Sequence, residues 1–413
     1  ILKFSTWEFT TRMLAEMQKK FCVFFKAAKV VSCAKQVGKK ATPILKSNFI
    51  STLQKKYPGL DKEPLDALIS ELLLSSFTLE LPKTVLTQAE KAIDEIFSYQ
   101  KKNYSSSFHP GNHAIAMSYD FHLNKSNELK LIEINTNASF LLMGLSLYEA
   151  LKIPRPTEFS EADLQKDVLD EMELCFGKRS APKALAIIDD NPPSQKLYVE
   201  FLLYQSLFRS FGWDCEICDF RELQFDEQQN VLTYKAKKLD FIYNRYTDFL
   251  LERSESQNLK KAFFSKAACF SPNPTEYKTY ADKERLIELG KTGTFPVVLQ
   301  SEELNSENKD KIWEKRKSLF FKPLRSYGSK QSYKGASISR KAFDEFGEGI
   351  LAQEYCPADE RTFSTPNGEQ NFKFDLRFYA YQNRLETVIA RLYQGQVTNT
   401  RTPFGGFAPV RFV

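Results

Sequence analysis

Apolar residues in the first hundred positions recur three and four apart, which is the spacing of one face of a helix. The pattern predicts helices over residues 4–36, 63–77 and 87–102, with Pro64 in the first turn of the second. We therefore expect residues 1–108 to form a helical region. No motif within it indicates a chemistry of its own.

The pattern changes to strand spacing after residue 113. Residues 114–121 and 129–135 are rich in apolar, β-prone residues, and they flank the polar turn 124–127. This arrangement predicts a β-hairpin.

Alternating strands and helices follow the hairpin. The apolar run 183–190 predicts a strand, residues 193–211 a helix, and residues 213–220 and 239–244 two further strands. Strand, helix and strand at this spacing are typical of a parallel α/β layer, and a helix over residues 160–177 precedes it. The loop after the first strand lacks the G-x-G-x-x-G pattern, which excludes a dinucleotide-binding fold.

The last hundred residues predict more strands. After a charged helix or linker at 300–317, the chain reads as strand, glycine-containing loop, strand, helix and strand from residue 319. Residues 372–381 and 385–393 alternate between apolar and polar positions around a tight turn, so they predict two long paired strands. The chain is therefore expected to be of the mixed α/β class.

The composition is that of an ordinary globular protein with two or three domains. The 413 residues are 42% hydrophobic and 27% charged, and the formal net charge is +6. This charge suits an anionic ligand such as a nucleotide but does not indicate a nucleic-acid-binding protein, which usually has a clustered basic face. Seven cysteines without framework spacing indicate a reducing compartment, the cytoplasm. Since no apolar run reaches about 18 residues, we expect no transmembrane segment.

Three oxygen-bearing residues of the hairpin form the first candidate site. Glu133 and Asn135 lie two apart on one strand, so their side chains leave the same face, and Asp120 on the partner strand can reach it. Ile132 and Ile134 are expected to point to the other face. Two carboxylates and an amide oxygen suit Mg²⁺ bound to the phosphates of ATP, and they do not suit zinc. The alternative is a solvated sheet face with ordinary polar alternation.

Lys322 is the second candidate. It follows the apolar segment 319–321, where a lysine is costly unless it meets an anion. The loop 325–335, which includes Ser326 and Gly328, offers hydroxyls, cations and backbone N–H groups that can cover phosphates. We expect this loop to be mobile in the free protein and to become ordered over Mg-ATP. A basic surface hairpin is the alternative for the loop.

A third candidate is the strand that ends at Gln353, Glu354 and Tyr355. We interpret it as an edge strand that could present backbone groups to an adenine ring, although an ordinary strand has the same pattern. The three histidines do not form a metal site or a catalytic triad.

Two arginines form the fourth candidate. Arg377 alternates with apolar residues on its strand, and Arg391 is expected across from it on the next strand. Such cations can hold a phosphoryl group or a substrate carboxylate. A cross-strand ion pair with Asp375 is an equal alternative.

The order of these motifs resembles that of one family. In most ATP-grasp enzymes a Lys-Pro strand precedes a metal-binding Glu-x-Asn, whereas here residues 133–135 precede Lys322-Pro323 by almost two hundred residues. The segment 273–278, with Lys283 beyond it, and the segment 397–404 complete the set. Over roughly residues 110–413 the chain resembles the circularly permuted ATP-grasp ligases related to glutathionylspermidine synthetase.

The resemblance implies a role for each candidate. Lys283 and Lys322 would bind the ATP phosphates, Asp120, Glu133 and Asn135 would bind Mg²⁺, and the hinge Gln353, Glu354 and Tyr355 would bind adenine. Arg391 would face the transferred phosphoryl group. Beside these roles we expect Ser326 and Gly328 to contribute to nucleotide binding, and Arg377 and Lys322 to take part in catalysis with Arg391. The family often has Arg where this chain has Ser118, and Asp-Thr-Pro where it has residues 137–139. The resemblance therefore does not extend to glutathione and polyamine substrates.

The same resemblance implies a division of the chain. After the helical region 1–108, the metal-binding part of the permuted C-lobe would span 109–180, and a pre-ATP-grasp α/β layer 181–275. The N-lobe with its phosphate loop would span 276–350, and the remainder of the C-lobe 351–413.

We expect an enzyme that uses ATP and Mg²⁺ to join a carboxylate to an amine or thiol through an acyl phosphate. Its partners would be a small-molecule or peptide carboxylate and an amine acceptor, with no nucleic acid and no membrane. Two alternatives stay open. Ser118 favours a degenerate scaffold that binds a nucleotide or a partner without ligation, and the same fold also supports phosphotransferases.

Overall fold

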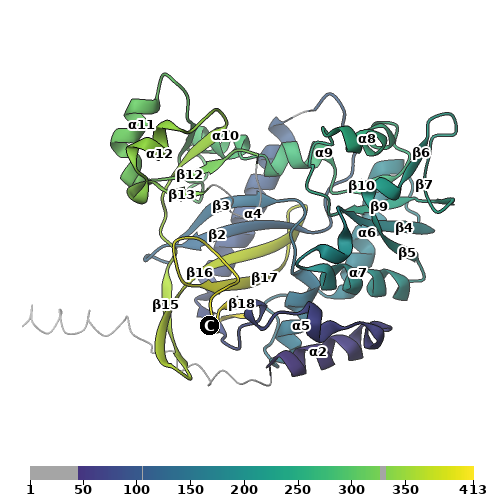
Figure 1. Ribbon diagram of the computed structural model, residues 1–413, viewed down its shortest axis with the longest axis horizontal. Coiled ribbons are helices and arrows are strands. Elements are labelled where there is room, and N and C mark those ends of the chain that lie inside the picture. Colours follow the sequence, from purple (N-terminus) through teal and green to yellow (C-terminus); the bar gives the residue numbers. More distant parts are fainter. Residues whose placement is uncertain (1–44, 105, 326–331) are drawn as a thin grey trace, which may run out of the picture. The chain divides into compact units, whose positions relative to one another are not determined.

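A computed structural model describes residues 45–104, 106–325 and 332–413, which form a mixed α/β structure (Figure 1). The helix expected over residues 4–36 lies outside the described residues, as do Ser326 and Gly328 and most of the loop predicted to cover phosphates. The helices are α2 (Leu45–Lys56), α3 (Leu65–Leu68), α4 (Lys83–Asn103), α5 (Leu141–Ala150), α6 (Glu161–Phe176), α7 (Tyr198–Ser210), α8 (Gln257–Phe264), α9 (Pro274–Glu276), α10 (Glu284–Thr292), α11 (Lys309–Lys315) and α12 (Arg340–Asp344).

The predicted hairpin and the two long C-terminal strands are confirmed, and they belong to one antiparallel sheet (Figure 1). Its strand order is β18-β17-β16-β2-β3, and β15 also pairs with β16. The strands are β2 (Met117–Leu123), β3 (Leu129–Asn135), β15 (Glu360–Thr365), β16 (Gly368–Tyr381), β17 (Arg384–Tyr393) and β18 (Gly406–Ala408). Strands from two distant parts of the sequence thus lie side by side.

One face of this large sheet is buried against α4. Because side chains alternate across a strand, every second residue of β2 and β16 is apolar and points the same way. These residues pack in one hydrophobic cluster with α4, whose amphipathic face supplies Val85, Ile93 and Ile96. The opposite face carries the polar residues of the candidate site.

The predicted parallel layer is confirmed as a four-stranded sheet in the order β10-β9-β4-β5. The strands are β4 (Ala184–Asp189), β5 (Asp214–Asp219), β9 (Phe241–Asn244) and β10 (Cys269–Ser271). Leu185 and Ile187 pack with α7 residues on one face, and Ala186 and Ile188 pack with α8 residues on the other. The helix expected from residue 193 begins only at Tyr198, since Pro192–Ser194 form a 3₁₀ turn.

A second antiparallel sheet has the order β11-β14-β12-β13. Its strands are β11 (Ser301–Glu303), β12 (Leu319–Pro323), β13 (Tyr333–Lys334) and β14 (Ile350–Glu354). Phe321 packs with Ile312 of α11 and Phe343 of α12. The prediction that β14 is an edge strand was wrong, because hydrogen bonds to β11 and β12 occupy both of its sides.

The helix predicted over residues 63–77 was also wrong beyond its first turn. The short α3 is followed by a 3₁₀ segment and by β1 (Leu79–Leu81), which pairs with β19 (Val410–Phe412). The backbone N–H of Ser75 donates to Phe407 O at 2.9 Å, so the C-terminal segment takes hydrogen bonds that a helix would have kept internal. The helix predicted at 87–102 is confirmed as the longer α4.

Three short strands, β6 (Gln224–Asp226), β7 (Val231–Tyr234) and β8 (Lys237–Lys238), form a further antiparallel sheet. Within the described ranges, every helix is too short or too polar to cross a membrane.

Candidate functional site

A cavity of about 750 Å³ is lined by the large sheet that contains β2 and β3 and by the sheet that contains β12 and β14. Its walls contain many of the residues selected from the sequence: Asp120, Glu133, Asn135, Lys283, Lys322, Gln353, Glu354, Tyr355 and Arg391. Arg377 is not among the lining residues. The fold therefore gathers into one cavity side chains that are up to 271 positions apart in the chain.

The large sheet supplies one wall through the alternation of its strands. In the register of β2 and β3, Ser118 lies opposite Asn135 and Asp120 opposite Glu133. On the other side of β2, Arg377 of β16 lies opposite Asp120. The polar residues thus form adjacent rows on the face that α4 does not cover.

A β-bulge changes the geometry of this wall. The register shifts between Asp120 and Phe121, so Ile132 has no Cα partner on β2. The expectation that Ile132 points away from the site was wrong, because the bulge turns it towards the cavity. The Ile132 carbonyl accepts a hydrogen bond from Lys322 Nζ at 2.7 Å, which joins the two sheets.

Asp120 lies at the centre of a buried ion network. Arg377 donates to both of its carboxylate oxygens, at 2.9 and 2.6 Å, and Arg391 Nη2 donates to Oδ2 at 2.8 Å. Arg391 Nε also donates to Asp375 at 2.6 Å. Burial alone would raise the pKa of Asp120, but the two guanidinium groups lower it to about 2. The cross-strand ion pair that the sequence left open is therefore present.

This network changes the proposed metal set. The oxygens of Asp120 already accept hydrogen bonds from two arginines and from the Ser118 hydroxyl. No group of three acidic, histidine or cysteine side chains in the described part of the chain could hold a metal ion. The other two members of the predicted metal set, Glu133 and Asn135, also line the cavity.

Lys322 lies on the opposite wall and is 5% exposed. Burial, helped by the nearby charge of Lys283, lowers the pKa of its ammonium to about 8, although the carboxylates of Glu133 and Asp120 act in the opposite direction. A buried lysine with a depressed pKa gains charge when an anion binds beside it. The cavity wall around Lys322 therefore suits an anionic ligand.

Two amide groups point to the same conclusion. Asn135 Nδ2 and Gln353 Nε2 are buried, and neither has a hydrogen-bond partner among the described residues. An unsatisfied buried donor costs about 1–3 kcal/mol, so both groups are expected to bond to a ligand in the cavity. Backbone N–H groups at the end of β14 are less available, since Glu354 N donates to Gln300 O and Tyr355 N to Ser318 O.

Sequence reasoning did not select several residues of the cavity wall. His122 lines it and shares a hydrogen bond of 2.7 Å with Cys356 O, and burial lowers the pKa of its imidazole. Lys196 and Arg401 also line it. Lys196 follows β4, at the carboxyl ends of the parallel strands, where open α/β sheets bind ligands. That rule could have identified Lys196 from the sequence.

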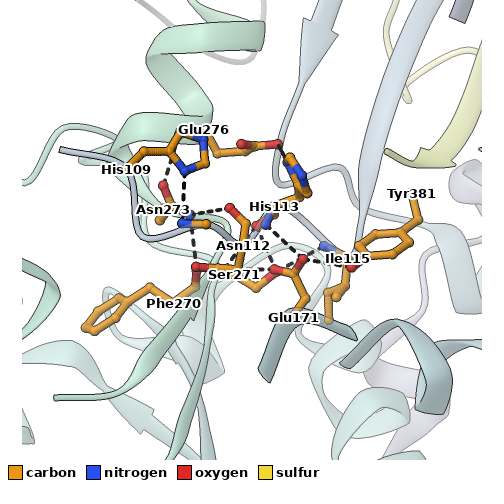
Figure 2. Close-up of polar contacts among 11 residues, drawn as sticks. His109, Asn112, His113, Ile115, Glu171, Phe270, Ser271, Asn273, Glu276 and Tyr381 are labelled. Carbon is orange, nitrogen blue, oxygen red and sulfur yellow. Dashed lines mark hydrogen bonds and ion pairs between the residues drawn. The ribbon is translucent and has the colours of Figure 1, made fainter. Parts of the chain in front are cut away.

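The segment 273–278 has a structural role in a buried polar junction (Figure 2). His113 bonds to Glu276 Oε1 through Nδ1 at 2.9 Å, and its backbone N–H donates to Glu171 at 2.8 Å. Tyr381 at the end of β16 donates to the same Glu171 oxygen at 2.9 Å. Asn273 caps α9 by accepting from Glu276 N–H. The junction joins the large sheet to α6 and to the segment that leads to Lys283.

No protein-family model and no curated protein matches this sequence. Solved structures match it distantly. The crystal structure of "Putative gamma-glutamylcysteine synthetase" from Methylobacillus flagellatus KT has 11% identity and a TM-score of 0.45, covering 78% of this chain and 84% of that chain. The ATP-grasp ligase PsnB, complexed with minimal precursor, Mg and ADP, has 12% identity and a TM-score of 0.32, covering 55% and 87%. Because both TM-scores lie below 0.5, the function of this protein has to be inferred from the geometry of its own cavity.

Proposed function

We propose that this protein is a Mg²⁺- and ATP-dependent ligase with a circularly permuted ATP-grasp fold, which joins a carboxylate to an amine. The observation that carries the proposal is the arrangement around Lys322. This buried lysine has a depressed pKa and faces Glu133 across a cavity that also contains the unsatisfied amides of Asn135 and Gln353. Cation, carboxylate and neutral amides together suit the phosphates, metal ion and base of a nucleotide.

In this proposal Lys322 and Lys283 neutralise the phosphates. Glu133 and Asn135 would hold Mg²⁺, with Asp120 able to join them only if its arginines moved. Mg²⁺ would supply charge neutralisation on the phosphate oxygens. Gln353 would contact the adenine through its side-chain amide, beside the aromatic rings of Phe320 and Tyr355, whose centroids lie 6.3 Å apart.

Arg391 would orient the substrate carboxylate. It lines the cavity, and Asp375 and Asp120 fix its guanidinium. One carboxylate oxygen attacks the γ-phosphorus of ATP, the bond to the β-phosphate oxygen breaks, and ADP leaves. An amine then attacks the acyl carbon, phosphate leaves, and the amine loses a proton to water. Arg377, bonded to Asp120 behind the wall, acts by positioning.

The test is a hydroxylamine trap. The purified protein is incubated with Mg-ATP, hydroxylamine and pools of amino acids, di- and tricarboxylates or short peptides. An acyl phosphate reacts with hydroxylamine to give a hydroxamate and phosphate. The expected result is that hydroxamate and ADP form in equal amounts and only when a carboxylate is present.

The alternatives give different results in the same assay. If the protein binds the nucleotide but forms no ADP with any of the substrate pools, the result would support a non-ligating scaffold. A phosphorylated product that resists hydroxylamine would support a phosphotransferase. Either result would overturn the ligase assignment.

Replacing Glu133 by Gln is expected to lower the rate of ADP release about a hundredfold, since it removes the carboxylate proposed to hold Mg²⁺. The matched control is Lys373→Gln. Lys373 also lines the cavity, but its Nζ donates to the backbone carbonyl of Gly395 at 2.8 Å. A rate for Glu133→Gln equal to that of Lys373→Gln would count against the assignment.

Nucleotide binding is also expected to take up a proton. Because Lys322 has a pKa of about 8 in the free protein, roughly half of it is neutral at pH 8, and phosphates beside it raise the pKa. Binding of Mg-ADP should then take up about half a proton at pH 8, nearly one at pH 9 and almost none at pH 6.5. Calorimetry in buffers of different ionisation enthalpy measures this uptake. The Lys322→Arg variant, which stays charged, should bind without it.

A further inference from the structure

We propose that Lys196 and Arg401 form a second anion-binding subsite in the same cavity, and that the carboxylate substrate is a dicarboxylate. The inference rests on the proposed function and deepens it. One carboxylate would lie at Arg391 and be activated, and the other would be held by the pair Lys196 and Arg401.

The two cations reach the cavity from different parts of the fold. Lys196 lies in the connection between β4 and α7, and Arg401 lies in the segment between β17 and β18. Lys196 Nζ donates to the hydroxyl of Thr400, the residue before Arg401. This contact brings the ammonium and the guanidinium to one end of the cavity wall.

Their charges are uncompensated by acidic side chains. No ion pair is formed by Lys196 or Arg401 within the part of the chain that the structure describes. Partial burial and the charge of Arg401 lower the pKa of Lys196. The repulsion between two neighbouring cations is relieved when an anion binds between them. Carboxylates are natural ligands for such a pair because guanidinium and ammonium groups both donate charge-assisted hydrogen bonds.

This pair is separate from the one assigned to the nucleotide. The charge of Lys283 lies close enough to lower the pKa of Lys322, whereas the charge of Arg401 lowers the pKa of Lys196. Lys283 and Lys322 belong to the part of the chain that carries the sheet β11-β14-β12-β13, and Lys196 belongs to the part that carries the parallel layer. The cavity thus has two pairs of cations, and Mg-ATP accounts for one of them.

The segment 398–401 sets the distance between the two carboxylates. Thr398 donates to Asp375, the partner of Arg391, and Thr400 accepts from Lys196. Thr398 and Arg401 are three residues apart, so their Cα atoms lie at most ~11 Å from each other, and short dicarboxylates are therefore the first probes to test. A monocarboxylate of the same length would leave the second pair without a partner.

The experiment compares matched ligands by calorimetry in the presence of Mg-ADP. The probes are glutarate, aspartate and glutamate, each with its monoamide: glutaramate, asparagine and glutamine. At least one dicarboxylate is expected to bind about tenfold or more tightly than its monoamide. Lys196→Gln and Arg401→Gln should each remove this preference and leave the affinity for Mg-ADP unchanged. Lys373→Gln should retain both.

The other possible results contradict either the anion-binding subsite or the proposed function. If no dicarboxylate binds at 10 mM, or if binding ignores both substitutions, the subsite is wrong although the nucleotide assignment stands. Weaker Mg-ADP binding in Lys196→Gln and Arg401→Gln would assign the pair to the nucleotide instead. Failure of the unmodified protein to bind Mg-ADP would contradict the proposed function itself.

Discussion

Replacing Lys322 with methionine is expected to weaken Mg-ATP binding about ten- to a hundredfold while making the free protein more stable. The variant loses the cation that faces the proposed phosphates, where a charge-assisted bond contributes about 1.5–3 kcal/mol. It also removes a buried charge whose pKa falls from 10.5 to about 8 on folding. That shift costs on the order of 3 kcal/mol at pH 7, and the lost hydrogen bond to Ile132 offsets about 1 kcal/mol of the gain.

The pH dependence gives a second readout of the same variant. The unfolded state binds more protons at Lys322 than the folded state between pH 8 and 10.5. The stability of the unmodified protein should therefore rise through this window, and the Lys322→Met variant should lack that rise. Urea denaturation at a series of pH values measures it. A variant that is less stable than the unmodified protein, or that retains its affinity for Mg-ATP, would contradict the assignment of Lys322.

Replacing Asp120 with asparagine is expected to destabilise the fold by about 3–5 kcal/mol, because removal of one partner leaves a buried charge uncompensated. The carboxylate of Asp120 serves both Arg377 and Arg391, and it is 1% exposed. Its pKa of about 2 lies below the ordinary value of 3.8. Its contribution to stability is therefore present above pH 3.8 and is lost as the pH falls through 2.

Two comparisons separate this effect from a general loss of charge. Arg340→Gln breaks exposed ion pairs with Asp310 and Asp344, so it should cost less than about 1 kcal/mol. The double variant Asp120→Leu, Arg377→Met replaces one buried ion pair with apolar groups and should recover part of the stability lost in Asp120→Asn. If Asp120→Asn costs no more than Arg340→Gln, the network does not stabilise the sheet.

Local pattern was sufficient to predict the hairpin of β2 and β3, because its strand composition and polar turn lie within twenty residues of sequence. It was insufficient wherever a distant segment decided the outcome. Ile132 faces the cavity because of a bulge that depends on the register with β2. Most of the helix expected over residues 63–77 does not form, because part of this segment hydrogen-bonds to residues more than three hundred positions later in the chain. Alternation of side chains along a strand does not reveal either event.

Among the site residues, too, some could be predicted from local sequence and others depend on distant segments. Glu133 and Lys322 could be selected because a carboxylate and a lysine next to β-prone apolar residues need partners. This argument does not select Lys196, which lies in a polar loop where a lysine is ordinary; only its place after a parallel strand could have identified it. The partners of Asp120 could not be identified in either way, because they depend on β2 pairing with β16 rather than on any feature near residue 120.

The pairing of β2 with β16 also affects when the protein can fold during its synthesis. Arg377 lies 257 positions after Asp120 in the chain, and Arg391 lies 271 positions after it. At ~5–20 residues per second the hairpin of β2 and β3 leaves the ribosome roughly 10–50 s before β16. During that interval the edge of β2 lacks its neighbouring strand, and exposed strand edges promote aggregation. The parallel layer, whose strands are encoded together, can fold in the same interval. We therefore expect chaperones that bind nascent chains to contact the hairpin before they contact the C-terminal strands.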